Sequence, residues 1–152
     1  MFAYINKKYG LDWLGHNSEK KWVMEFADKW PQQISLPDKI ATHPTKMDYE
    51  TAVVLKKSGC YTVQLGVESI SEEVREKIFN RREDNDSILS ACKAMDNASL
   101  RYTIDYIMGA PLQSEAEYIA AARFFMNLKK CIRITSFIIS FFPNTPLVEV
   151  GR

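Results

Sequence analysis

The stretch RYTIDYIMGAPLQSEAEY, residues 101–118, carries the pattern that decides the fold. Its β-branched and aromatic residues predict a strand over 100–108, and Gly109 followed by Pro111 predicts a tight turn. The Ser-x-x-Glu pattern that starts at Ser114 is typical of a helix N-terminus. A buried strand that runs through a short turn into a capped helix is the repeating unit of parallel α/β folds.

The same alternation of strands and helices extends in both directions along the chain. Residues 60–67 and 131–142 predict two further strands, and residues 38–43 predict a weak one. The helices between them are expected to begin at Ser18, Asp48, Ser69 and Ser114, with Pro31 and Gly59 ending the first two. This order predicts parallel strands with right-handed crossovers. The apolar character of the last two strands predicts cover on both faces, as in an α/β barrel or a doubly wound sheet.

Composition limits the classes of protein that the chain can belong to. Its 152 residues suit one domain or a piece of a larger one. The net charge of +1 argues against broad capture of nucleic acid or an anionic membrane. No apolar run approaches a membrane span, and the N-terminus has no signal-peptide pattern, so the cytoplasm is the expected location. The three cysteines, Cys60, Cys92 and Cys131, lie more than 30 residues apart and are expected to be small buried hydrophobes.

Ligands of barrels and doubly wound sheets bind at the carboxyl ends of the strands, so the candidate site residues are sought there. Glu68 follows a strand and precedes a helix, where it either complements the helix dipole or contacts a ligand. Asp105 lies inside a strand, on the same face as Thr103 and Ile107. A carboxylate there is costly to bury unless it is paired. Its expected partner is a nearby Lys or Arg, or a hydroxyl or amino group of a ligand.

Other residues at these strand ends carry weaker signals. Gly109 permits a close backbone approach or a positive φ. Arg81 and Arg82 lie in a polar loop, where they are either exposed or reach back to a carboxylate ligand. His43 is expected to be a local hydrogen bonder, because no second metal-binding residue lies at ligand spacing. No P-loop, GxSxG, HExxH or GxGxxG motif and no basic stripe with interleaved aromatics occurs in the sequence.

Three segments, taken in order, resemble the radical S-adenosylmethionine (SAM) enzyme family. Residues 55–81, LKKSGCYTVQLGVESISEEVREKIFNR, are similar to the family's fourth-strand region, and residues 103–118 to its fifth-strand pattern Asp-x-Ile-x-Gly-x-Pro-x-Gln-Thr. Residues 137–147, FIISFFPNTPL, are similar to the sixth strand and its Pro-Gly-Thr-Pro-Leu close. The likeness covers roughly residues 32–148. It is nearest to members that often carry a cobalamin-binding domain upstream, and coproporphyrinogen oxidase-like members share the fifth-strand pattern.

The departures from the family pattern within these segments are mild. Asn144 replaces the usual Gly, Ser114 replaces Thr, and Leu112 stands where many members have Gly or a polar residue.

The resemblance implies a fold, a cofactor and a set of site residues. The fold would be an α/β partial (β/α)6 TIM-like barrel of parallel strands with outer helices. Glu68 and Asp105 would accept hydrogen bonds from the ribose or amino groups of SAM, and Arg81, with Arg82 as its competitor, would face the methionine carboxylate. The backbone from Ile107 to Gly109 and the end of the last strand would lie against the adenine.

One family motif is missing from the sequence. The three cysteines of C-x3-C-x2-C, which hold the family's 4Fe-4S cluster, do not occur, and Cys60 begins a later strand and cannot substitute for them. We therefore expect residues 1–31 to be a helical lead-in that follows a missing second strand, and residues 32–152 to be a partial barrel of strands three to six. Such a chain is expected to be inactive alone and to expose an unpaired strand edge.

The resemblance also implies partners for the parent enzyme. It would reductively cleave SAM to a 5′-deoxyadenosyl radical with electrons from a flavodoxin or ferredoxin. Its substrate, its use of cobalamin and its oligomeric state stay open. Two alternatives also stay open: a stand-alone α/β nucleotide-binding module, and a non-catalytic remnant of the barrel. An in-frame cysteine motif in the DNA upstream of Met1 would favour the truncated enzyme over both.

Overall fold

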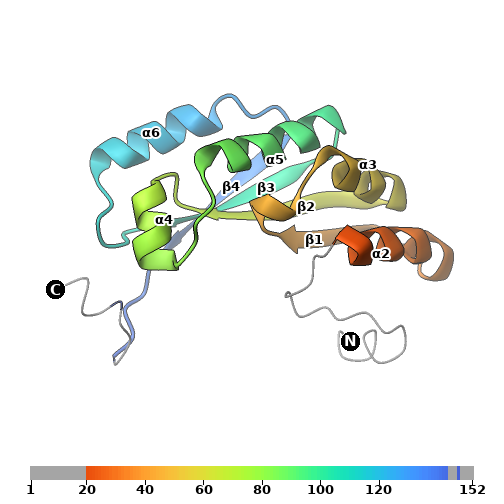
Figure 1. Cartoon of the computed structure of the whole chain (residues 1–152), viewed down its shortest axis with the longest axis horizontal. Coiled ribbons are helices and arrows are strands. Elements are labelled where there is room, and N and C mark those ends of the chain that lie inside the picture. The colour runs from red at the N-terminus through yellow and green to blue at the C-terminus, as the bar shows by residue number, and fades with distance from the viewer. Residues whose placement is uncertain (1–19, 144–146, 148–152) are drawn as a thin grey trace.

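The computed structural model describes residues 20–143 and residue 147 (Figure 1). Four strands in this part of the chain form one parallel sheet in the order β1-β2-β3-β4. Parallel pairing of strands that follow one another through helices confirms the predicted α/β architecture. The strands are β1 (Asp38–Thr42), β2 (Cys60–Glu68), β3 (Tyr102–Met108) and β4 (Cys131–Ile138).

Helices connect the strands and lie mainly on one face of the sheet. Figure 1 shows α3, α5 and α6 over that face, and α2 beside the edge strand β1. The helices are α2 (Lys20–Gln33), the short 3-10 helix η1 (Pro44–Lys46), α3 (Tyr49–Ser58), α4 (Glu72–Phe79), α5 (Asn85–Asn97) and α6 (Glu115–Phe125).

Strand β2 shows how alternation divides the sheet into a core face and an open face. Val63, Leu65 and Val67 are fully buried and belong to the same apolar cluster as residues of α3 and α5. Since successive side chains of a strand point to opposite faces, Gln64 and Glu68 project from the face without those helices. This second face would be the inside of a barrel, and the polar residues of β2 lie on it.

The predicted helix α3 is confirmed, together with both of its caps. The Asp48 side chain accepts a hydrogen bond from the Thr51 backbone N–H at 2.8 Å. Gly59 ends the helix with a φ of 101°, in the left-handed region that favours glycine. The cap at Ser114, which accepts from the Glu117 N–H, confirms the start of α6.

Two other predicted helix boundaries are wrong. Helix α4 is capped by Ser71, which accepts from the Val74 N–H, whereas the hydroxyl of Ser69 donates to Glu117 and ties the end of β2 to α6. Helix α2 continues past Pro31 to Gln33. A proline this close to a helix end removes one hydrogen bond without preventing the last residues from staying helical. The cap predicted at Ser18 lies outside the described residues.

The prediction that both faces of the last strand are covered is wrong. Ile132, Phe137 and Ile138 are 54%, 48% and 83% exposed. Strand β4 pairs only with β3 among the described residues, so it lacks the second neighbour whose helix would cover it. Strand β1 likewise pairs only with β2 in the part of the chain that the structure describes.

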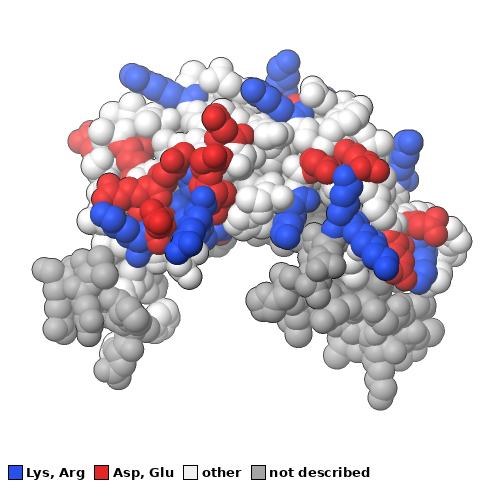
Figure 2. All heavy atoms as spheres, in the orientation of Figure 1, with Lys and Arg blue, Asp and Glu red and all other residues white. Residues whose placement is uncertain are grey.

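Two further features concern the charge of the surface and the hydrophobicity of the helices. On the face shown in Figure 2, Lys and Arg side chains lie interspersed with Asp and Glu, so that face carries no large field of one sign. None of the helices in the described ranges is long and apolar enough to cross a membrane.

Candidate ligand site at the carboxyl ends of the strands

A cavity of about 450 Å³ lies between β1, β2, β3 and α2. This volume is within the range of small-molecule sites. Its polar wall includes Thr42, His43, Gln64, Glu68, Arg81 and Asp105. Its apolar wall includes Trp22, Val23, Phe26, Ile40, Met47 and Leu55. Three predicted site residues that are far apart in the sequence, Glu68, Arg81 and Asp105, therefore meet in one hollow.

Glu68 ends β2 in an unusual backbone conformation. Its φ is 64°, in a region that a residue with a side chain seldom occupies, and the register with β3 shifts between Gly66 and Glu68. Strained residues of this kind concentrate at functional sites because the surrounding structure must hold them. Burial raises the pKa of the Glu68 carboxyl, nearby Asp105 adds to this, and the Arg81 guanidinium opposes it.

Arg81 reaches the cavity because the chain reverses at the end of α4. Asn80 closes that helix in the left-handed conformation with a φ of 52°, and the next residue then turns back toward β2. The Arg81 Nη1 donates to Glu68 Oε1 at 3.0 Å, and its Nη2 donates to the Gly66 carbonyl oxygen at 2.9 Å. The guanidinium is thus locked against the end of β2.

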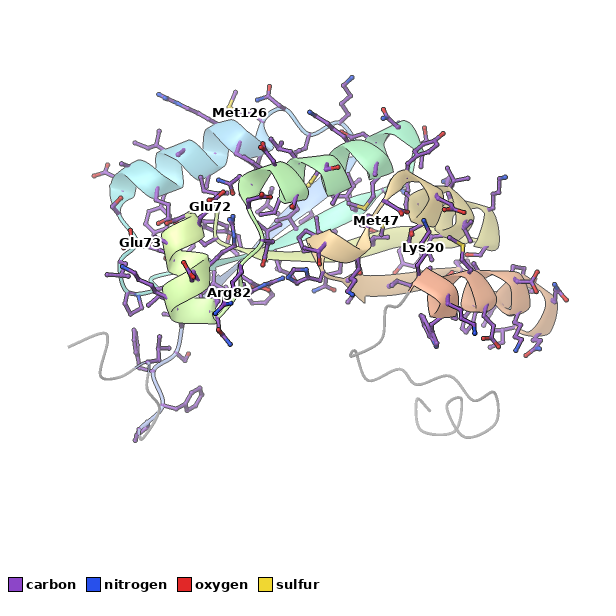
Figure 3. The ribbon with its side chains drawn as sticks, in the orientation of Figure 1. Lys20, Met47, Glu72, Glu73, Arg82 and Met126 are labelled. Carbon is purple, nitrogen blue, oxygen red and sulfur yellow. The ribbon has the colours of Figure 1, made fainter. Side chains whose placement is uncertain are left out.

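The structure separates Arg81 from its competitor Arg82. The Arg81 side chain is 17% exposed and lines the cavity. Arg82 is exposed and does not line the cavity; Figure 3 labels it near the end of α4.

Asp105 has a partner other than the one that its sequence context predicted. Its Oδ2 accepts a hydrogen bond from the Gln64 side-chain amide at 2.5 Å, across the β2–β3 pair. A neutral amide satisfies one lone pair of the carboxylate but leaves its charge unbalanced. No Lys or Arg of the described residues pairs with Asp105, so of the two kinds of partner left open by the sequence the ligand group remains, and Asp105 keeps acceptor capacity toward the cavity.

The sequence reading missed Glu83, whose side chain is only 1% exposed. Its Oε1 lies 2.9 Å from Arg81 Nε, and its Oε2 lies 3.3 Å from Nε2 of His43. Glu83 follows two arginines in the polar run NRREDND, which gave no signal of burial. A loop that folds back under the cavity wall buries it.

His43 is a local hydrogen bonder, as predicted, and it also faces Glu83. Its Nδ1 accepts from the Thr45 N–H at the start of η1. In the neutral ring the proton must then sit on Nε2, which donates toward Glu83. Burial and the nearby Arg81 lower the pKa of His43, which favours this neutral form.

Ile107 lies further along β3 and Gly109 directly after it, and neither lines the cavity. Gly109 has a φ of 78°, as its turn requires, and its N–H donates to the Tyr118 hydroxyl. The Gln113 side chain fixes this turn, since it donates to the Ile107 carbonyl and accepts from the Ala110 N–H, both at 2.9 Å. The turn is rigid, but the structure does not bring it to the three charged residues.

The residues present do not fit an iron–sulfur cluster. No group of three or more His, Cys, Asp or Glu side chains in the described ranges is arranged to hold a metal ion. Cys60 and Cys92 are buried, and burial raises the pKa of each thiol to about 12, which disfavours the thiolate that an iron ligand requires.

A parallel α/β sheet with charged side chains gathered near the carboxyl ends of its strands defines an α/β ligand-binding domain of the barrel type. Comparison with known families narrows this class. The Radical SAM superfamily matches residues 33–125, more than half of the chain, and the chain therefore belongs to that superfamily. A search of curated proteins gives no match.

Solved structures of radical SAM enzymes share this fold. Coproporphyrinogen III oxidase (HemN) from Escherichia coli matches with a TM-score of 0.69 and 16% identity, over 90% of this chain and 31% of that one. The SAM methyltransferase TsrM from Kitasatospora setae, with cobalamin and a 4Fe-4S cluster bound, matches with a TM-score of 0.67 and 17% identity, over 84% of this chain and 26% of that one.

Methylornithine synthase matches with a TM-score of 0.64 and 17% identity, over 85% of this chain and 37% of that one. The chain thus spans between a quarter and two fifths of these proteins. These likenesses support the TIM-barrel-like fold.

Proposed function

We propose that this chain forms part of the SAM site of a radical SAM enzyme, and that Glu68, Arg81 and Asp105 contact that cofactor. The observation that carries the proposal is the convergence of these three residues on one 450 Å³ cavity. Superfamily members reductively cleave SAM at a 4Fe-4S cluster. The ligands for that cluster are absent here, so no cleavage step follows from this chain, and alone it would bind without reacting.

The charge of the cavity wall suits SAM. Glu68 and Asp105 line the cavity and Glu83 lies behind it against Arg81, so three carboxylates stand against the two cations Arg81 and Lys46. SAM carries a sulfonium, an ammonium and a carboxylate, and so has a net positive charge that this wall attracts. The phosphates of a nucleotide would be repelled, which argues against the alternative of a nucleotide-binding module.

The Glu68–Arg81 pair suits a zwitterionic amino acid. A ligand with only one charge would separate the pair and leave one half-buried partner without a counter-ion. The methionine end of SAM offers both charges, so its carboxylate can pair with Arg81 while its ammonium or the ribose hydroxyls pair with Glu68. In this arrangement Asp105 accepts from the remaining hydroxyl or amino group.

Four further expectations are kept as proposals. The first is the division into a lead-in over residues 1–31 and a partial barrel over 32–152. The second is contact of the Ile107–Gly109 backbone with adenine, supported by the hydrogen bonds that fix the turn there.

The other two concern the whole enzyme. The third is an external reductant such as a flavodoxin or ferredoxin. The fourth is a cytoplasmic location, since the free cysteines fit a reducing compartment. Cobalamin, present in TsrM, has no support from a residue of this chain.

Isothermal titration of SAM into the protein tests the proposal. Asp105→Asn and Glu68→Gln each remove one charged acceptor, so each is expected to weaken binding about tenfold or more. Arg82→Ala is the matched control, and its affinity should equal that of the wild type. If SAM gives no heat with the wild type at several temperatures, the proposal is wrong, and the alternative of a non-catalytic remnant of the barrel is favoured.

A further inference from the structure

The guanidinium of Arg81 has two carboxylate neighbours on different elements. Glu68 lies at the end of β2, on the cavity side, and Glu83 lies in the loop between α4 and α5, on the protein side. The Glu68 side chain is 23% exposed, whereas that of Glu83 is only 1% exposed. A ligand in the cavity can therefore displace Glu68 but cannot reach Glu83.

The main chain at Glu83 is held firmly by a second arginine. Arg75 is fully buried and donates from Nε and Nη2 to the Glu83 carbonyl oxygen, at 3.2 Å and 2.9 Å. Its other bonds go to the Ser69 carbonyl and the Asn85 side chain, and they fix the loop against the end of β2. Glu83 is thus anchored independently of Arg81.

The Glu83 carboxylate has unused bonding capacity. Its Oε1 approaches Arg81 Nε to 2.9 Å as an ion pair, but it accepts no hydrogen bond of good geometry among the described residues. A buried carboxylate oxygen without a donor is costly. A small rotation of the Arg81 fork, once Glu68 releases it, would supply that donor.

From this geometry we propose that Glu83 is a positioning residue, which holds Arg81 in the cavity wall when a ligand carboxylate replaces Glu68. The inference rests on the proposed function, because it concerns the carboxylate of the ligand's amino-acid end. Without Glu83 the guanidinium would have only the Gly66 carbonyl and the ligand to orient it, so recognition of the carboxylate would suffer while other contacts remained.

The test compares SAM with its decarboxylated analogue, which keeps the nucleoside, the sulfonium and the amine. Both are titrated into the full chain and into Glu83→Gln. We expect Glu83→Gln to weaken SAM binding about tenfold and to leave the affinity of the analogue unchanged. A merely structural role would weaken both ligands equally, and that result, or no change for either, overturns the inference.

The design keeps this failure distinct from that of the proposed function. If the wild type fails to bind SAM, the site itself is wrong; if it binds but Glu83→Gln does not discriminate, only the role of Glu83 is wrong. Glu73→Gln makes the same charge change at an exposed position paired with Lys77 and should leave both affinities unchanged. Should thermal melting show that Glu83→Gln is unfolded, Glu83→Asp, which keeps the charge on a shorter side chain, must show the same selective loss.

Discussion

Two regions of the molecule differ in what they bury. The region around β1 and β2 buries carboxylates, whereas the outer strand β4 exposes large apolar side chains. Asp38 at the start of β1 and Glu83 in the loop after α4 are buried, with 4% and 8% of each whole residue exposed. On β4, Ile132 and Ile138 are 54% and 83% exposed. Burial here follows the position of an element in the sheet and the loops folded against it rather than residue type. Glu83 lies behind the proposed ligand site, against Arg81, whereas Asp38 lies at the other end of β1 and β4 contributes nothing to the cavity.

The largest expected effect is on the free energy of unfolding, when one large apolar side chain in each region is shortened to alanine. Leu65 is fully buried in β2, so Leu65→Ala is expected to lower the free energy of unfolding by about 3 kcal/mol. Ile138→Ala on β4 should change it by less than about 0.5 kcal/mol, because that side chain is already in water. Urea denaturation of the two variants measures both values. Equal losses would show that β4 is packed as tightly as β2.

A second, smaller effect concerns the buried charge at the start of β1. Burial raises the pKa of Asp38 from 3.8 to about 6, and neither carboxylate oxygen has a hydrogen-bond partner among the described residues. Because the folded-state pKa is raised, the protonated group stabilises the fold below pH 4, and this contribution is lost as pH rises through 6. Asp38→Asn should therefore be more stable than the wild type by about 2 kcal/mol at pH 7.5.

The pH profile of the Asp38→Asn variant provides the check. Its advantage in free energy of unfolding should shrink toward zero as pH falls from 7 to 4, since the wild-type carboxyl is then neutral. An advantage independent of pH would mean that Asp38 is not the titrating group.

The third prediction compares two glycine substitutions, one beside the proposed ligand site and one away from it. A Cβ added at Gly66 would lie 2.8 Å from Glu68 Oε1 and 3.4 Å from Arg81 Nη1, so Gly66→Ala must disturb that ion pair. We expect it to weaken SAM binding about tenfold. Gly59→Ala is the control: its φ of 101° should cost about 1 kcal/mol of stability, and binding should be unchanged because Gly59 precedes β2, at the opposite end of that strand from Glu68. Loss of binding in both variants would indicate general unfolding.

Local signals in the sequence predicted most of the fold. The strands, the α3 caps and the cap at Ser114 follow from periodicity and from residues whose side chains bond nearby backbone groups. The helix boundaries predicted at Pro31 and Ser69 are wrong, because helix ends also depend on tertiary contacts. The Ser69 hydroxyl, for example, donates to Glu117 of α6 and does not cap α4. Exposure of β4 could not be predicted, since its composition matches that of a buried strand.

The candidate site was predicted in part. Glu68, Arg81 and Asp105 were named from their positions after strands or from the family resemblance, and the structure brings all three together. Their partners were not foreseen. Gln64 meets Asp105 only through strand register, and Glu83 meets Arg81 only because the α4–α5 loop folds back. Such pairings are tertiary, and no local pattern contains them.

An amide NMR titration with SAM tests the central claim most directly, because it reports on both regions of the sheet in one experiment. The proposed site predicts saturable shifts for the amides of Gly66, Glu68, Arg81 and Asp105, and none for Cys131 and Ile132 at the amino end of β4, away from the residues that pair with Asp105 and Ile107. Shifts confined to the amino end of β4, or no shift anywhere at millimolar SAM, would contradict it.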